Sequence, residues 1–274
     1  MKRVGDDSDT MPASARWTTR IALFSAALAL SALFLHRLFS IPTPVALNLV
    51  KLSFLGGFIS LALALFASIR IWRVGGKGGV RVLAGVLTAL VVIGWPLPHL
   101  ATLRDLPEIN DLTTDTQSPP AFRKLAQERA PDANDPDYPG DGFAAEQARA
   151  YPDIRPLLID RSVGEAYELS AEALRRQRMV IVNEEPPGEE FPATGILEAY
   201  DRTLLWGFYD DVVVRVTGTN QTARIDLRSA SRYGRHDLGR NAERLRRLLK
   251  EIVARMEATV PASEAQPENA KARR

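Results

Sequence analysis

The sequence predicts an α+β protein: three N-terminal transmembrane helices followed by a two-layer sandwich of a mostly antiparallel sheet with two main helices. Three observations support this fold class. The apolar residues of the 274-residue chain are concentrated in residues 21–103, and the remainder is polar and charged. A composition divided in this way indicates two regions in different solvents. In the polar part, short alternating runs lie between stretches with helical periodicity, which is typical of a sheet covered by helices.

The apolar region contains three candidate membrane spans. Each is apolar over about 20 residues, the length that a helix needs to cross the ~30 Å core of a bilayer. The spans cover residues 21–39, 45–69 and 82–103. Pro96 and Pro98 are expected to kink or end the third span. No small-x-small cleavage site follows the first span before Pro42, which disfavours a cleaved signal peptide.

The distribution of Lys and Arg predicts the orientation of the spans. Basic residues precede the first span and flank the short link between the second and third, at Lys2, Arg3, Arg16, Arg20, Arg70, Arg73, Lys77 and Arg81. Loops rich in Lys and Arg stay in the cytoplasm. We therefore expect a multi-pass protein of the bacterial inner (plasma) membrane, with its N-terminus in the cytoplasm and its C-terminal domain in the periplasm.

The interiors of the spans predict an anchor in the lipid bilayer. None contains Asp or Glu, whereas transporters and proton relays usually place ionisable groups at mid-membrane. Gly56, Gly57 and Gly85 lie within the spans, and glycine lets neighbouring helices approach closely. The chain then divides into a cytoplasmic N-terminal segment, a transmembrane region, a periplasmic domain and a disordered tail, over residues 1–20, 21–104, 105–258 and 259–274.

The organised part of the periplasmic domain is expected to begin near Ile154. Ser118 and Ser162 stand at N-cap positions before two helical runs, a short one over 119–130 and a longer one over 163–178. Residues 131–142 are expected to form a loop. A last helix is predicted over 237–256, capped by Asp237. The strands are expected over residues 157–159, 179–182, 194–201, 211–217 and 223–231.

The strand over residues 223–231 alternates between two kinds of side chain. Because successive side chains of a strand point to opposite faces, one set is expected to face the helices, namely Ile225, Leu227, Ser229 and Ser231. The other set forms a row of arginines, Arg224, Arg228 and Arg232, joined by Arg215 of the preceding strand.

The densest motif runs from this strand into the last helix. It reads Arg228-Ser229-Ala230-Ser231-Arg232-Tyr233-Gly234, then Asp237-Leu238-Gly239-Arg240-Asn241 and Arg244. With Phe-Tyr-Asp-Asp-Val at 208–212 and Ile-Asn-Asp-Leu-Thr-Thr-Asp at 109–115, it resembles the signature of the DUF1499 family, over about residues 105–258. Arg235 and His236 stand where the family often has an aromatic residue and a Ser. The family is of unknown function, so the resemblance implies a domain and no reaction.

Two interpretations of this motif remain open. In the first, Arg228 and Arg232 offer planar forks to a carboxylate or phosphate ligand beside the N-terminus of the last helix. In the second, Asp210 and Asp211 pair with those arginines and the network is structural. The candidate residues for either role are Asp210, Asp211, Arg228, Ser229, Ser231, Arg232, Asp237, Asn241 and Arg244.

Composition limits the chemistry further. The chain has no cysteine, which excludes disulfides and thiol nucleophiles, and we expect no metal site and no cofactor. The net charge of +2 gives no reason to expect nucleic acid as a partner. We assign no catalytic residues and expect a binding or envelope accessory module, with an envelope protein or a small anionic or lipid-like ligand as partner. The alternative is a hydrolase using Ser231, His236 and Asp237, although no nucleophile elbow is present.

Overall fold

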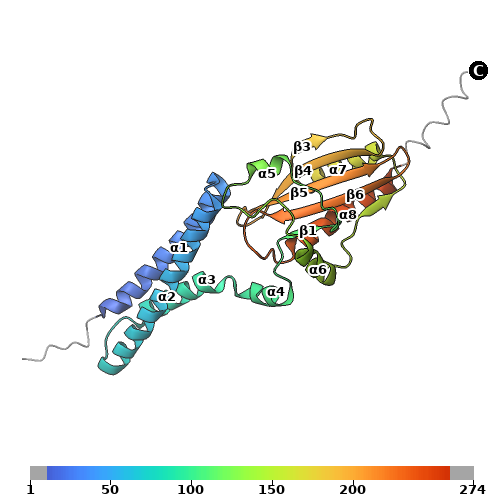
Figure 1. The fold of residues 1–274 in the computed structure, drawn as a ribbon. Helices are drawn as coiled ribbons and strands as arrows, with labels where there is room; N and C mark the ends of the chain where they lie inside the picture. The colour runs from blue at the N-terminus through green and yellow to red at the C-terminus, as the bar shows by residue number, and fades with distance from the viewer. Residues whose placement is uncertain (1–10, 260–274) are drawn as a thin grey trace, which may run out of the picture. The chain divides into compact units, whose positions relative to one another are not determined.

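A computed structural model describes residues 11–259 (Figure 1). Internal contacts divide these residues into two compact units. The first unit contains residues 11–100 together with Leu204–Gly207, and the second contains residues 101–203 and 208–259. The predicted tail lies outside the described residues from residue 260 onward, as do Lys2 and Arg3 of the predicted cytoplasmic segment.

The predicted spans are confirmed as helices. Within the described residues, three helical segments are long and apolar enough to cross a membrane. The first two are α1 (Ala13–Phe39) and α2 (Thr43–Val74), which extend beyond the predicted bounds into the basic flanks. The third comprises α3 (Gly79–Gly94), a 3₁₀ turn (Leu97–His99) and α4 (Leu100–Asp105). As expected from the two prolines, α3 ends just before Pro96.

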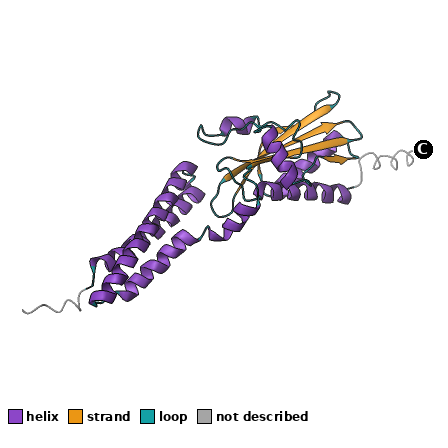
Figure 2. Ribbon diagram, turned by 60° about the horizontal axis from the view of Figure 1, so that its bottom comes forward, coloured by secondary structure: helices purple, strands orange, loops and turns teal. Residues whose placement is uncertain are grey.

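The helices α1, α2 and α3 pack against one another (Figures 1 and 2). Small residues lie at their contacts. A Cβ atom added to Gly56 would lie 2.1 Å from the Oγ of Ser25, and one added to Gly85 would lie 2.6 Å from Cγ2 of Thr18. The buried positions of α2 are almost all small, at Thr43, Ala46, Val50, Ser53, Gly57, Ser60, Ala64 and Ala67. The predicted close approach at the glycines is therefore confirmed.

The second unit is built on one antiparallel sheet, and the predicted α+β class is confirmed. Over the described residues the sheet has six strands in the order β1-β6-β5-β4-β3, with β2 also paired to β6. Figure 2 shows these strands as a continuous layer. The bounds are β1 Asp111–Thr113, β2 Leu157–Ile159, β3 Val180–Glu185, β4 Ala193–Arg202, β5 Tyr209–Gly218 and β6 Ala223–Ser231.

Two helices cover one face of the sheet, as predicted. They are α7 (Val163–Arg176) and α8 (Arg240–Ala258), and both pack on β6 and on each other. Ser162 caps α7 in a reciprocal capping box with Glu165, which confirms the predicted start of that helix. The main core lies between these helices and the strands, and its fully buried side chains include Leu174, Leu197, Ile225, Leu227, Leu245, Leu248 and Ile252.

The predicted helix over 119–130 is wrong, because only α5 (Lys124–Glu128) forms. Pro119 is followed by Pro120, and a residue that precedes proline is disfavoured in the helical region. The helix starts instead at the residues whose backbone N–H groups bond to Glu198 of β4. The fully buried Glu198 carboxylate accepts hydrogen bonds from the backbone N–H groups of Arg123, Lys124 and Leu125, at 2.7–3.3 Å.

The organised part of the domain begins well before Ile154, so that expectation is also wrong. The three-residue strand β1 pairs with Arg228, Ser229 and Ala230 of β6. A further helix, α6 (Asp141–Ala150), begins within the last two residues of the predicted loop over 131–142. Its Gln147 side chain donates to the carbonyl of Thr113 at 2.6 Å and accepts from the N–H of Thr113 at 3.0 Å. A strand this short has no pattern of its own and exists because β6 and Gln147 supply its hydrogen bonds.

Candidate functional site

The sheet separates the candidate residues into two clusters on opposite faces. β6 alternates as predicted, with Ile225 and Leu227 in the core beneath the helices and Arg228 on the other face. Because neighbouring strand residues alternate in the same way, Asp210 and Asp211 also diverge. The cluster on the helix side contains Asp210, Ser229, Ser231, Asp237, Asn241 and Arg244, and the opposite face holds Asp211, Arg228 and Arg232.

The guanidinium of Arg244 is the centre of the cluster on the helix side. It is fully buried, and its Nη2 donates to Asp210 at 2.6 Å and to Asp201 at 3.0 Å. Its Nη1 donates to the side-chain oxygens of Asn241 at 2.5 Å and Ser229 at 3.1 Å. The cluster thus links α8 to β4, β5 and β6. Its charged and amide groups form hydrogen bonds with one another.

Asp237 holds the start of α8, although not from the predicted position. The helix begins at Arg240 with Gly239 at the N-cap. The Asp237 carboxylate accepts from the N–H groups of Gly239 and Asn241, both at 2.8 Å. Gly239 has a φ of +78°, which favours glycine, and a Cβ there would lie 2.8 Å from the side chain of Leu106. Burial raises the pKa of Asp237, and these two hydrogen bonds oppose the shift.

On the opposite face, Arg228 forms a buried bidentate ion pair with Asp111. Its Nε and Nη2 donate to the two carboxylate oxygens of Asp111 at 2.9 and 2.7 Å. Its Nη1 donates to the carbonyl of Pro120 at 3.1 Å, and Nη2 also donates to that of Pro136 at 2.8 Å. Every nitrogen of Arg228 is therefore bonded within the protein, and the side chain is 2% exposed.

A second buried carboxylate, Asp211, lies between two arginines. Its two oxygens accept from Nε of Arg232 at 2.8 Å and from Nε of Arg129 at 2.9 Å. The Nη1 of Arg129 donates to the carbonyls of Asn134 and Asp135, both at 2.9 Å. The predicted pairing of Asp211 with Arg232 is thus present, whereas Arg228 pairs with Asp111 and Asp210 pairs with Arg244.

A cleft of about 290 Å³ opens beside these two ion pairs. It is lined by Asn110, Asp111, Arg129, Asn134, Asp135, Asp137, Tyr138, Pro139, Ala230 and Ser231. Two buried polar atoms of its lining have no hydrogen-bond partner among residues 11–259, the Nη2 of Arg129 and the phenol oxygen of Tyr138. We call this feature the polar cleft.

Burial shifts the pKa values of two groups in the polar cleft. It raises the pKa of Asp111, while the guanidinium groups of Arg228 and Arg129 oppose the rise. It also raises the pKa of Tyr138 to about 12, and the nearby Asp111 carboxylate adds to that shift. The Tyr138 phenol is therefore neutral at physiological pH and can both donate and accept a hydrogen bond.

The three residues of the hydrolase alternative are bonded to other groups. The Oγ of Ser231 accepts from the Asn241 amide at 3.1 Å. The two ring nitrogens of His236 face the carbonyl of Leu106 at 3.2 Å and the N–H of Leu238 at 2.8 Å. A serine nucleophile needs its base within hydrogen-bond reach. Among the hydrogen bonds of residues 11–259, none joins Ser231 to His236.

Sequence reasoning missed the residues that complete the polar cleft. The sequence predicts Arg129 inside a helix and Tyr138 inside a loop, and neither pattern indicates a site. Asn110 and Asn134 donate to the carbonyl of Gly234 at 2.6 and 2.8 Å and so hold the turn after β6. The signal in the sequence is the motif at 109–115, which supplies Asn110 and Asp111 to the cleft.

The fold and the polar cleft together define a class of protein. Its members combine helices that are long and apolar enough to cross a membrane with an α+β domain that contains buried ion pairs and a small polar cleft. The family described as "Protein of unknown function (DUF1499)" matches residues 111–252. The chain belongs to this family, which confirms the resemblance seen in the sequence. No curated protein and no solved structure matches the chain.

Proposed function

We propose that this protein is a membrane-anchored binding module of the cell envelope and that the polar cleft is its ligand site. The observation that carries the proposal is the pair of buried, unpartnered polar atoms on Arg129 and Tyr138. Leaving a buried donor or acceptor unsatisfied costs about 1–3 kcal/mol. Both atoms have less than 1 Å² of exposed surface, so in this proposal the lining of the polar cleft shifts to admit a ligand oxygen that bonds to Arg129 and Tyr138.

The charges around the polar cleft define the ligand class. Arg129 contributes a guanidinium whose Nη2 has no partner among residues 11–259, while Asp111, Asp135 and Asp137 line the same cleft. These carboxylates disfavour an extended polyanion. The ligand in this proposal is small and presents a single carboxylate or phosphate group. A free metabolite, a lipid headgroup or an acidic side chain of an envelope protein could supply that chemistry. Arg228 and Arg232 act by positioning Asp111 and Asp211 rather than by binding.

The membrane topology is part of the proposal. The basic residues at the start of α1 and between α2 and α3 support a cytoplasmic N-terminus, a periplasmic domain and insertion in the inner membrane. Alkaline phosphatase, which is active only in the periplasm, should be active when fused after residue 258 and inactive when fused after residue 76. The reverse pattern would overturn the orientation.

Tyr138→Phe is the sharpest test of the polar cleft. Its phenol oxygen has no protein partner in the described residues, so its removal should not destabilise the fold. Tyr167→Phe is the matched control, because the Tyr167 phenol is also buried and unpartnered but lies outside the cleft lining, beside Gly195. Small molecules released from the purified full-length proteins can be compared by mass spectrometry. We expect a compound whose recovery falls about tenfold in Tyr138→Phe, since one lost hydrogen bond is worth about 1.4 kcal/mol.

Two outcomes would contradict the binding proposal. One is equal recovery of every compound from the wild type and both variants. The other is an equal loss in Tyr138→Phe and Tyr167→Phe, which would indicate a general effect of removing a buried phenol. Complementation of a deletion strain gives an independent readout, in which only Tyr138→Phe should fail.

A further inference from the structure

The tip of the loop between β4 and β5 carries an apolar triplet, Leu204-Leu205-Trp206. Leu204 is 88% exposed and Leu205 is 61% exposed. The internal contacts of the chain group this tip with the first unit, which contains α1, α2 and α3. Adjacent exposed leucines at the tip of a loop are unusual on a protein surface that faces water, and they mark an interaction site.

Hydrogen bonds fix the backbone of the tip at the C-terminal end of α1. His36 Nδ1 donates to the carbonyl of Trp206 at 2.6 Å, while its Nε2 faces the hydroxyl of Thr43 at 3.0 Å. The Nε of Arg37 donates to the carbonyl of Leu204 at 3.3 Å. These bonds use the backbone of the tip and leave the two leucine side chains exposed.

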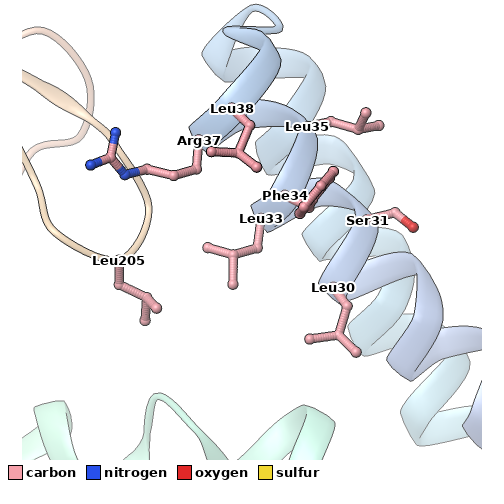
Figure 3. Close-up of a pocket in the computed structure, with 8 residues that line it drawn as sticks. All are labelled: Leu30, Ser31, Leu33, Phe34, Leu35, Arg37, Leu38 and Leu205. Atoms are coloured by element: carbon pink, nitrogen blue, oxygen red, sulfur yellow. The ribbon is translucent and has the colours of Figure 1, made fainter.

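An apolar hollow of about 610 Å³ lies beside this tip. Figure 3 shows Leu205 and the α1 residues Leu30 and Leu33 directed toward the same space, with the guanidinium of Arg37 at its edge. Phe34 also lines it, and Leu30 and Phe34 are both more than half exposed. The hollow thus combines an apolar wall with one positive charge at the end of a helix that is long enough to cross a membrane.

We propose that the Leu204–Trp206 tip is inserted in the bilayer and that the hollow holds one acyl chain of a membrane phospholipid, whose phosphate lies near Arg37. The surface of a membrane-spanning helix faces hydrocarbon, so the hollow is continuous with lipid rather than with water. The rings of Trp206 and Trp95 lie 5.3 Å apart, and indoles prefer the interface between hydrocarbon and headgroups. The inference rests on the membrane-anchored part of the proposed function and is independent of the polar cleft.

The absence of cysteine allows a direct test in proteoliposomes of the full chain. Single-cysteine variants at Leu205, Phe58 and Leu158 would carry an environment-sensitive fluorophore. Phe58 is an exposed residue inside α2, and Leu158 is an exposed leucine of β2. We expect the label at position 205 to emit at shorter wavelength and to be quenched by doxyl-labelled phosphatidylcholine, as at position 58. The label at position 158 should be quenched by aqueous iodide instead.

The two controls separate the possible failures. If position 205 behaves like position 158 while position 58 is quenched by lipid, the tip is not inserted and the inference is overturned. If position 58 also behaves like position 158, the membrane-spanning proposal itself fails.

Bound phospholipid gives the second measurement. Native mass spectrometry of the detergent-solubilised full chain should show one retained phospholipid on the wild type and on Leu158→Asp. In Leu205→Asp the retained fraction should fall about tenfold. Equal retention in Leu205→Asp and Leu158→Asp would overturn the acyl-chain site.

Discussion

Each of the two units of this protein is stabilised internally by a different kind of contact. In the unit that contains the three long helices, small residues lie at the helix contacts. Gly56 and Gly85 let neighbouring helices approach so closely that an added Cβ would collide with Ser25 and Thr18. The second unit packs leucines and isoleucines between a sheet and two helices and adds buried ion pairs on both sheet faces. In lipid, apolar burial does not drive helices together, so close packing must do so. In water, apolar burial provides the stability, and the buried charges need matched partners.

The largest effect is expected from breaking a buried ion pair in the second unit. Arg244→Met leaves Asp210 and Asp201 without their guanidinium in the core, which should lower the free energy of unfolding by about 3–5 kcal/mol. Urea titration of the full chain in mild detergent measures this loss. Arg247→Met is the control, because Arg247 is exposed and pairs with Glu243 at 3.6 Å, so its loss should be under about 0.5 kcal/mol. Equal effects would show that the polar cluster adds nothing to the core.

A methyl group added at a helix contact probes the other unit. In Gly85→Ala the new Cβ would lie 2.6 Å from Thr18 Cγ2 and 3.1 Å from backbone atoms of α1, so overpacking should cost about 1–3 kcal/mol. Gly79→Ala is the control, since no atom lies within 4 Å of the added Cβ. Thermal unfolding in detergent compares the two variants. An unchanged midpoint in Gly85→Ala would mean that close packing is not what holds these helices.

A smaller effect separates a real helix cap from an apparent one. Ser162→Ala removes the capping box of α7 and should cost about 1 kcal/mol. Ser118→Ala replaces a serine that had the same sequence signal, but α5 does not begin near it. It should leave the urea midpoint unchanged. A loss in Ser118→Ala equal to that in Ser162→Ala would indicate that residues 119–130 are helical after all.

The smallest effect concerns the pH dependence of the polar cleft. Because the pKa of Tyr138 is raised from 10.0 to about 12, the folded state favours the neutral phenol. The stability associated with that phenol is complete below pH 10 and is lost as the pH rises from 10 through 12. Between pH 9 and pH 11 the thermal midpoint of the wild type should therefore fall further than that of Tyr138→Phe. Parallel midpoints would show that the phenol reaches water freely.

Much of the fold could be predicted from local pattern. The strand over 223–231 and the start of α7 at Val163 were predicted to the residue, because alternation and a capping serine are local signals. The helix over 119–130 failed because its start depends on Glu198, more than 70 residues away in the chain. β1 and α6 were missed for the same reason, since their hydrogen bonds come from β6 and from each other.

The sequence indicated which polar side chains gather in the motif, but not how they pair. The nine candidate residues are all polar, and all of them except Arg232 are buried. Their division between two faces follows from strand alternation, yet their partners do not. Nothing in the pattern around Arg228 or Arg244 distinguishes Asp111 from Asp210 as a partner.

The sequence by itself determined the features that depend on neighbours along the chain: three apolar spans, the alternation of β6 and membership of the DUF1499 family. The length of an apolar run and the periodicity of a strand can be read from neighbouring residues. They indicate directly which side chains prefer lipid, water or the protein core. Only the tertiary structure decided which carboxylate meets which arginine, that Arg129 and Tyr138 line one cleft, and that Leu204–Gly207 group with the three long helices. Those facts depend on contacts between residues far apart in the chain, which compact folding creates and local pattern does not encode.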